Sequence, residues 1–156
     1  MLAIDIPGFA DLRLEHLVLD FNGTLAVDGR LLRGVAPVLR ELSAALQIHV
    51  HTADTFGQAA EELAGLPLRL VVIRSANQAE MKLELVRRLD VSRVAAIGNG
   101  RNDRMMLEAV ALGIAVMQHE GAAQTTLGHA DVVTPGILEA LGLLQHPLRL
   151  AATLRA

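Results

Sequence analysis

The chain has 156 residues, of which 52% are hydrophobic, and its formal net charge is -3. We expect one core domain over residues 1–156, since a chain of this length buries about two-thirds of its unfolded surface. Charges interrupt every apolar run before about 20 residues, the length of a membrane helix, so we expect no membrane partner. The acidic balance and the 2% aromatic content exclude a broad nucleic-acid-binding surface. The absence of cysteine excludes disulfides and thiolate chemistry and favours a cytoplasmic location.

Apolar periodicity predicts strands that alternate with helices along most of the chain. Residues 2–6, the turn at Pro7-Gly8 and the run that ends at Asp20 predict a hairpin leading into a central strand. The pair Asp28-Gly29 predicts a small β flap over residues 25–33. The later elements are expected in this order: helix 34–46, strand 48–51, helix 54–63, strand 68–73, helix 77–89, strand 94–97, helix 103–111, strand 113–117, helix 121–127, strand 130–134 and a helical tail over 135–156.

This alternation predicts an α/β fold in which helices cover both faces of a mostly parallel sheet. The connections are short, so we expect no inserted cap domain and a site that is open to water. In such a sheet the loops that follow neighbouring parallel strands converge on one crevice.

Polar residues of four kinds follow strands or begin helices where such a crevice would form. They are Asp20 with Thr24 nearby, Thr52, Lys82 and the loop 99–103. Lys82 is the one lysine beside thirteen arginines. An acid, a hydroxyl, an ammonium and an acid-bearing loop are the groups that handle a phosphoryl group together with a divalent cation.

Each feature also has an ordinary structural explanation. Asp20 can cap the turn at Asn22-Gly23, and Thr52 and Asp103 can begin helices. The pattern Gly98-x-Gly100 lacks the third glycine of a dinucleotide site. His49 and His51 share one strand face, as metal ligands do, but the sequence shows no third ligand, so we do not expect zinc.

The four motifs in this order resemble those of the haloacid dehalogenase-like superfamily of phosphatases and P-type ATPase catalytic domains. They are D-F-N-G-T-L at 20–25, H-T at 51–52, Lys82 and G-N-G-R-N-D at 98–103. The resemblance covers about residues 13–134 and is strongest to the capless, soluble P-type ATPase-like members. It implies a three-layer α/β/α Rossmann-like sandwich with strand order 5-4-1-2-3 and the Asp20 strand at the centre.

The resemblance also implies roles for individual residues in a Mg²⁺-dependent phosphatase. The catalytic residues would be Asp20, the nucleophile that forms an aspartyl-phosphate, and Asn22. The phosphate-binding residues would be Gly23, Thr24, Thr52, Ala53, Lys82 and Asn102. The Mg²⁺ ligands would be Asp20, Asn22 through its backbone carbonyl, Asn99 and Asp103, the last directly or through water.

Two positions depart from the pattern of the family. Asn22 stands where most family phosphatases have an acid–base Asp, so a factor of about 10²–10⁴ in rate should be lost. P-type ATPases also lack an acid there, and their phosphoenzyme is long-lived. Asn99 stands where a metal-binding Asp is usual, which should weaken metal binding. We therefore expect a slow phosphatase.

Two other functions stay open at this point. One is a catalytically degenerate family member that acts as a binding or regulatory module. The other is a phosphoacceptor receiver domain, although that class has a pair of acids early in the chain and no Gly-Thr after the acceptor. The substrate would be a phosphorylated compound of unknown identity. The resemblance to capless family members implies that a second copy of the chain would cover the open site. The apolar tail is a candidate contact surface, and packing of the tail on its own domain is the equal alternative.

Overall fold

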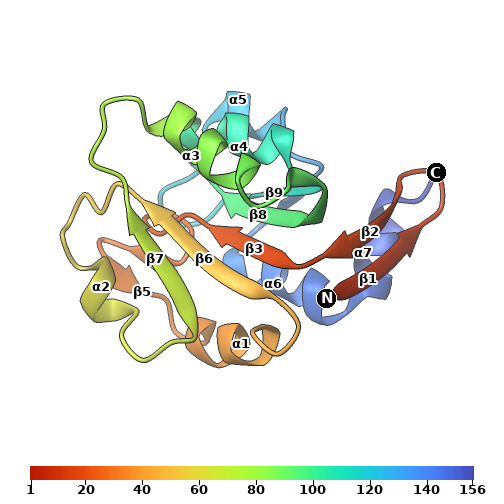
Figure 1. The fold of residues 1–156 in the computed structure, drawn as a ribbon, viewed down its shortest axis with the longest axis horizontal. Helices are drawn as coiled ribbons and strands as arrows, with labels where there is room; N and C mark the ends of the chain where they lie inside the picture. The colour runs from red at the N-terminus through yellow and green to blue at the C-terminus, as the bar shows by residue number, and fades with distance from the viewer.

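The computed structural model describes every residue from Met1 to Ala156 (Figure 1). The strands are β1 (Leu2–Ile6), β2 (Ala10–Leu14), β3 (His16–Leu19), β4 (Ala26–Val27), β5 (Arg30–Leu31), β6 (Gln47–Thr52), β7 (Leu68–Val72), β8 (Val94–Gly98), β9 (Leu112–Val116) and β10 (Val132–Thr134). The α-helices are α1 (Val35–Leu42), α2 (Ala59–Glu62), α3 (Gln78–Arg87), α4 (Arg104–Ala109), α5 (Gln124–Leu127), α6 (Ile137–Gln145) and α7 (Pro147–Leu154). Two 3₁₀ turns, η1 (Val91–Arg93) and η2 (Arg101–Asp103), precede β8 and α4. None of the helices is long and apolar enough to cross a bilayer.

Six strands form one parallel sheet in the order β10-β9-β8-β3-β6-β7. This confirms the expected order, because the five predicted core strands are β3, β6, β7, β8 and β9, and β10 adds a sixth at the edge. The strand that precedes Asp20 lies in the middle, between β8 and β6. The carboxyl ends of its neighbours therefore flank the residue that follows it.

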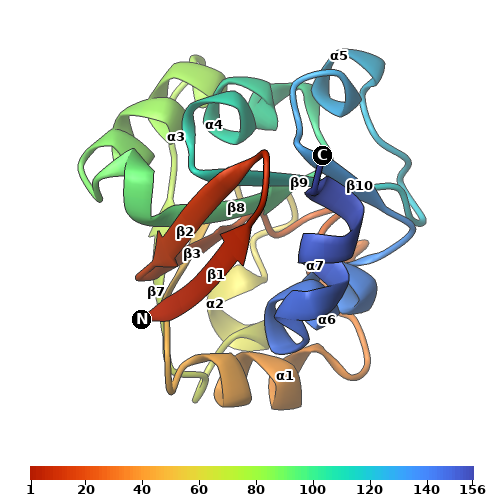
Figure 2. The ribbon, with the colours of Figure 1, turned by 90° about the vertical axis from the view of Figure 1, so that its right-hand side faces the viewer.

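Helices cover both faces of this sheet, as the α/β class requires (Figure 2). The strands β8 and β9 are buried throughout, which explains why they read as continuous apolar runs. On one face α1 and α6 bury residues such as Leu39 and Leu141 against Leu17 and Leu19. On the other face α3 and α4 bury residues such as Val86 and Met106 against Val18.

The connections after β3 and β6 contain little regular structure. The strands β4 and β5 form a two-residue hairpin whose turn residues, Asp28 and Gly29, both have positive φ. The helix expected from about residue 54 to 63 is shorter, since α2 covers only Ala59–Glu62. Asp54 has a positive φ, and its carboxylate accepts the N–H groups of Gln58 and Ala59, so the chain turns before the helix begins.

The two ends of the chain pack together beside the sheet. The strands β1 and β2 form an antiparallel hairpin, and α7 lies against β1 (Figure 2). In the apolar tail, Leu141, Leu144 and Leu150 belong to the core, whereas Leu148 is 85% exposed. Most of the tail therefore packs against its own chain.

Candidate active site

The central parallel strands place their following residues around one small pocket. Asp20 follows β3, Thr52 ends β6 and Asn99 follows β8. The pocket has a volume of about 170 Å³ and is lined by Asp20, Asn22, Thr52, Ala53, Thr55, Asn99, Gly100, Asn102 and Glu120. We call it the catalytic pocket.

Lys82 lies beneath this pocket and joins two carboxylates. Its ammonium donates to Asp20 Oδ1 at 2.7 Å and to Asp103 Oδ1 at 2.6 Å. Lys82 and Asp103 are fully buried, and Asp20 is only 7% exposed. The helix α3 thus delivers its lysine from the first turns into the gap between the loops that follow β3 and β8.

This buried triad contains one positive and two negative charges, and the pKa of Asp20 is raised to about 6. The causes are burial and the nearby charge of Asp103, which outweigh the opposing effect of Lys82. Burial disfavours the charged form of Lys82, but Asp103 and Asp20 outweigh it and hold the pKa of Lys82 above its usual value. Asp20 is therefore a carboxylate at pH 7 and above, held by a permanent cation.

The loop after Asp20 is folded tightly enough to require glycine. The Phe21 carbonyl accepts the N–H groups of Leu25 and Ala26. Gly23 has φ +80°, and a Cβ there would lie 2.4 Å from Asn99 Nδ2 and 2.7 Å from a Glu120 carboxylate oxygen. Both its conformation and its surroundings exclude a side chain at this position.

Thr24 links the loop after β3 to the loop after β8. Its buried hydroxyl lies 3.3 Å from Asp20 Oδ2 and 3.2 Å from Asn99 Oδ1. The Asn99 Nδ2 group donates to the Gly121 carbonyl, which turns Oδ1 toward Thr24. Because one hydroxyl has one proton, Asp20 and Asn99 share a single donor, and lone pairs on both oxygens stay available.

Asp103 organises the loop after β8. Its Oδ1 accepts from Lys82, and its Oδ2 accepts the N–H groups of Asn99 and Gly100 at 3.0 and 2.9 Å. The position of the Asp103 carboxylate also requires glycine at residue 98, since a Cβ there would lie 2.5 Å from it. Both oxygens of Asp103 are thus occupied by donors from the chain itself.

The structure brings all the predicted site residues together, but in two layers. Five line the catalytic pocket directly with Asp20: Asn22, Thr52, Ala53, Asn99 and Asn102. Thr24, Lys82 and Asp103 are fully buried and support the pocket without lining it, and Gly23 packs against Asn99 and Glu120. Thr52 uses its hydroxyl oxygen to accept the N–H of Asp54, which leaves the hydroxyl proton free to donate.

Sequence reasoning missed the contribution of the loop after β9. Glu120, an exposed residue of this loop, lines the catalytic pocket and approaches Gly23 and Asn99. Gln118 ties the same loop to the carbonyl groups of Gly23 and Thr24. A signal was available, because the loop after any neighbouring parallel strand reaches the same edge of the sheet.

Oxygen donors in the catalytic pocket suit a hard divalent cation. The Oδ1 atom of Asn22 is buried without a hydrogen-bond partner, and no protein N–H donates to the Asn22 carbonyl. Asp20 Oδ2 and Asn99 Oδ1 share the one Thr24 proton, and Glu120 makes no ion pair. No three His, Cys, Asp or Glu side chains are grouped to hold a metal by themselves. A bound Mg²⁺ would therefore need amide or carbonyl oxygens as well as carboxylates.

A row of histidines lies on the α3–α4 side of the sheet. His16 Nδ1 lies 3.2 Å from His49 Nε2, and the rings of His49 and His51 are 6.1 Å apart. Burial lowers the pKa of His49 to about 4, helped by the nearby charges of His16 and Arg69. Burial and the charges of His49 and Lys82 lower the pKa of His51 to about 4.

We expect acid to destabilise the protein through His49 and His51. Between pH 6.5, their usual pKa, and about pH 4, His49 and His51 are protonated in the unfolded chain but neutral in the folded chain. The free energy of unfolding therefore falls as the pH falls. Asp20 has the opposite effect on stability between about pH 6 and pH 3.8, because the folded chain binds its proton first. This one group offsets only part of the effect of the two histidines. Urea unfolding at pH 7.5 and 5.0 should show a net loss of about 2 kcal/mol at the lower pH.

The double variant His49→Gln, His51→Gln identifies the source of this pH dependence. Its stability should change less between the two pH values than that of the wild type, or should rise at pH 5.0. An equal loss in both proteins would assign the acid sensitivity to other groups.

Comparison with known proteins agrees with this geometry. A model of the haloacid dehalogenase-like hydrolase family matches residues 78–139, which contain Lys82, Asn99 and Asp103. The uncharacterized protein MJ0073 of Methanocaldococcus jannaschii is 40% identical over 83 residues, which are 52% of this chain and 89% of that protein.

Two solved structures show the extent of the similarity. The 3-deoxy-D-manno-octulosonate 8-phosphate phosphatase of Moraxella catarrhalis, in complex with magnesium, phosphate and KDO, has a TM-score of 0.65 and 16% identity over 84% of this chain and 85% of that chain. A zinc-transporting PIB-type ATPase has a TM-score of 0.63 and 28% identity over 79% of this chain and 20% of that chain. Because the family model spans the segments that carry Lys82 and the loop after β8, and the chain has the matching fold, it belongs to the haloacid dehalogenase-like hydrolase superfamily.

Proposed function

We propose that this protein is a Mg²⁺-dependent phosphatase that works through an aspartyl-phosphate at Asp20, with slow turnover. The observation that carries the proposal is the pairing of Asp20 with Lys82 at the floor of the catalytic pocket. Lys82 holds Oδ1 at 2.7 Å, whereas Oδ2 has only the shared and longer contact with Thr24. Oδ2 is therefore the oxygen free to attack.

The residues of the pocket suggest a sequence of two displacements. Asp20 Oδ2 attacks phosphorus, the bond to the leaving oxygen breaks, and that oxygen takes a proton from water. A water molecule then attacks phosphorus, the bond to Asp20 breaks, and phosphate leaves. Thr52 can donate its hydroxyl proton to a phosphoryl oxygen, and the Asn102 amide can do the same.

Mg²⁺ would be held by the Asp20 oxygen that does not attack, the Asn22 carbonyl and Asn99, with Glu120 as a further carboxylate at the edge of the pocket. When bound, it supplies positive charge against the transferred phosphoryl oxygens. The magnesium and phosphate in the Moraxella phosphatase support this choice of metal and substrate group. We assign Asp103 to holding Lys82 and Asn99 in place, since both its oxygens accept from the chain.

Slow turnover follows from Asn22, whose amide lines the pocket where a proton would have to move. An amide cannot exchange a proton with the leaving group or with the attacking water. The likeness to the zinc-transporting ATPase supports the same P-type ATPase-like interpretation. A second copy of the chain over the open pocket and a cytoplasmic location remain proposals that rest on the sequence.

Removal of the metal provides the direct test of this function. We expect release of inorganic phosphate from p-nitrophenyl phosphate to stop when the protein is treated with a chelator and to return when Mg²⁺ is added. Activity that survives chelation would contradict the metal-dependent mechanism. Binding of inorganic phosphate with Mg²⁺ but no turnover on a broad panel would instead favour a degenerate binding module, which the amides at Asn22 and Asn99 would explain.

A further inference from the structure

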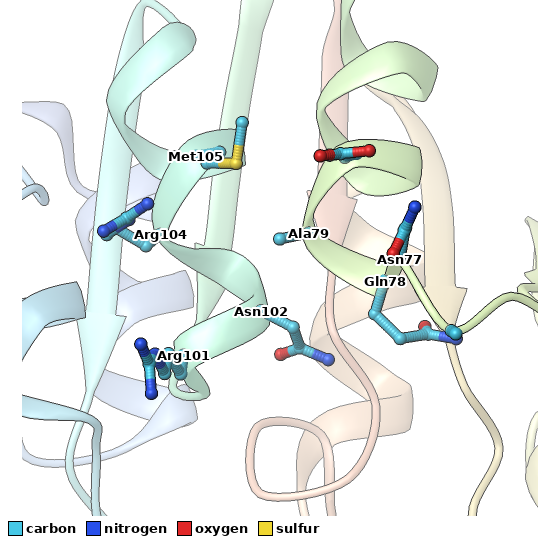
Figure 3. A pocket seen from close by; sticks show the side chains of 9 residues that line it. Asn77, Gln78, Ala79, Arg101, Asn102, Arg104 and Met105 are labelled. Carbon is cyan, nitrogen blue, oxygen red and sulfur yellow. The ribbon is translucent and has the colours of Figure 1, made fainter.

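A second and larger pocket adjoins the catalytic pocket. It lies between the first turn of α3 and the η2–α4 segment and has a volume of about 470 Å³ (Figure 3). We call it the α3–α4 pocket. Asn102 lines both pockets, and Figure 3 shows its side chain between the two helical segments. A substrate with its phosphoryl group at Asp20 could therefore extend past Asn102 into this space.

The catalytic pocket, with a volume of about 170 Å³, is smaller than most small-molecule sites. A leaving group whose phosphoryl group lies at Asp20 would therefore extend beyond it. The α3–α4 pocket has a volume within the usual range of small-molecule sites, about 300–1,000 Å³.

The charges around the α3–α4 pocket favour an anion. Arg101 and Arg104 line it from one side, and neither guanidinium has an ion-pair partner in the chain. The opposing charge comes from a single acid, Glu80, so the lining has a net positive charge. Guanidinium groups bind carboxylates and phosphates through paired N–H donors.

Amide groups complete the lining on the α3 side. Figure 3 shows Asn77 and Gln78 on the α3 side, across from Arg101 and Arg104. The Asn77 side chain does not cap the helix, so its amide is available to a ligand. The Gln78 Nε2 group donates to the carbonyls of Ile73 and Ser75, which fixes this side chain at the pocket wall.

We propose that the α3–α4 pocket binds the leaving group of the substrate and selects one that carries its own anionic group, a carboxylate or a second phosphate. The proposal rests on the phosphatase function proposed above and adds the chemical class of the substrate. The phosphoryl group lies at Asp20, the leaving group passes Asn102, and its anion lies against Arg101 and Arg104. A neutral leaving group gains nothing from the two arginines.

A pair of matched substrates tests this selectivity. Glucose 6-phosphate and 6-phosphogluconate have the same carbon chain length, and only the second has a carboxylate; fructose 1,6-bisphosphate supplies a second phosphate instead. The ratio of kcat/KM for each anionic substrate to that for glucose 6-phosphate should fall at least about tenfold in the double variant Arg101→Gln, Arg104→Gln. The anion that shows the larger fall is the preferred one.

Two further variants separate local recognition from overall charge. Glu80→Gln removes the one acid of the pocket and should raise the same ratio. Arg87→Gln, at the other end of α3, changes the net charge by the same amount as one pocket arginine and should leave the ratio unchanged. An unchanged ratio in the double variant, or an equal fall in Arg87→Gln, would overturn the proposal.

Direct binding keeps this test independent of turnover. Calorimetry on Asp20→Asn should show that 6-phosphogluconate binds more tightly than glucose 6-phosphate, and that the difference is lost when both arginines are also replaced. This result would stand even if no phosphate is ever released, in which case only the catalytic proposal fails. Equal affinity for the two compounds would contradict the anion-selective pocket whether or not the protein is a phosphatase.

Discussion

Replacing Asp20 by Asn is expected to abolish phosphate release and to stabilise the folded protein. The activity should fall by at least about 10³-fold, because the amide cannot form the covalent intermediate that divides the reaction into two displacements. The shape of the side chain is kept, and Asn Oδ1 can still accept from Lys82. The loss would therefore come from the chemistry and not from a collapsed pocket.

The gain in stability has a separate physical cause. Asp20 has a pKa of about 6 in the fold against an ordinary value of 3.8, so keeping it ionised above pH 6 costs up to roughly 3 kcal/mol. Asn carries no charge to bury, and Lys82 with Asp103 becomes a neutral pair. We expect urea unfolding at pH 7.5 to show a gain of about 1–3 kcal/mol, which disappears as the pH falls toward 4.

A matched control makes the two readouts decisive. Asp11 is an exposed residue of the β1–β2 hairpin and lines neither pocket, and Asp11→Asn makes the same change of charge and shape. That variant should keep both activity and stability. Substantial activity in Asp20→Asn would remove Asp20 as the nucleophile, and a loss of stability would show that the carboxylate is a net support of the fold.

Much of the fold was predictable because the sequence shows two clear patterns, short apolar runs for the buried strands and apolar residues at helical spacing for the helices. The apolar runs of β8, of β9 and of β3 after His16 have no polar face, which is typical of strands covered on both sides. The helix predicted over residues 54–63 was wrong over its first half, because α2 begins only at Ala59. A side chain that accepts N–H groups four and five residues ahead, as Asp54 does, can cap a helix or fold a loop before one.

The residues of the candidate site were predictable from the sequence. Which of them line the catalytic pocket and which are buried beneath it was not. The order of Asp20, Thr52, Lys82 and the loop 98–103 follows from motifs and from the geometry of parallel sheets. That Lys82 is fully buried and joins two carboxylates depends on how deeply α3 packs, which no local pattern encodes. Glu120 was missed because an exposed acid in a polar loop has no periodicity that distinguishes it from any other.

Replacing Asn22 by Asp is expected to increase turnover by about 10²–10⁴-fold. Asn22 lines the catalytic pocket beside Asp20, and its Nδ2 group, which the substitution replaces by an oxygen, donates no hydrogen bond to the chain. A carboxyl group of the same shape could give a proton to the leaving oxygen and then take one from the attacking water. Steady-state phosphate release from p-nitrophenyl phosphate, followed across pH, measures both effects.

The pH profile separates proton transfer from a simple change of charge. A new carboxylate beside Asp20 also disfavours the ionised form of Asp20, so the rising limb of the profile should lie at higher pH than in the wild type. A falling limb should appear at higher pH, where the new acid loses the proton that the leaving group needs. The wild type should show the rising limb alone, because Asn22 does not titrate.

Asn102→Asp is the matched control, since it makes the same amide-to-acid change elsewhere in the catalytic pocket. It should lower activity, because a carboxylate at that position repels the phosphoryl group and is not placed to transfer a proton. An Asn22→Asp protein that folds normally yet turns over no faster than the wild type would contradict the account of the missing acid. The slow step would then lie in metal binding, where Asn99 is the residue to change next.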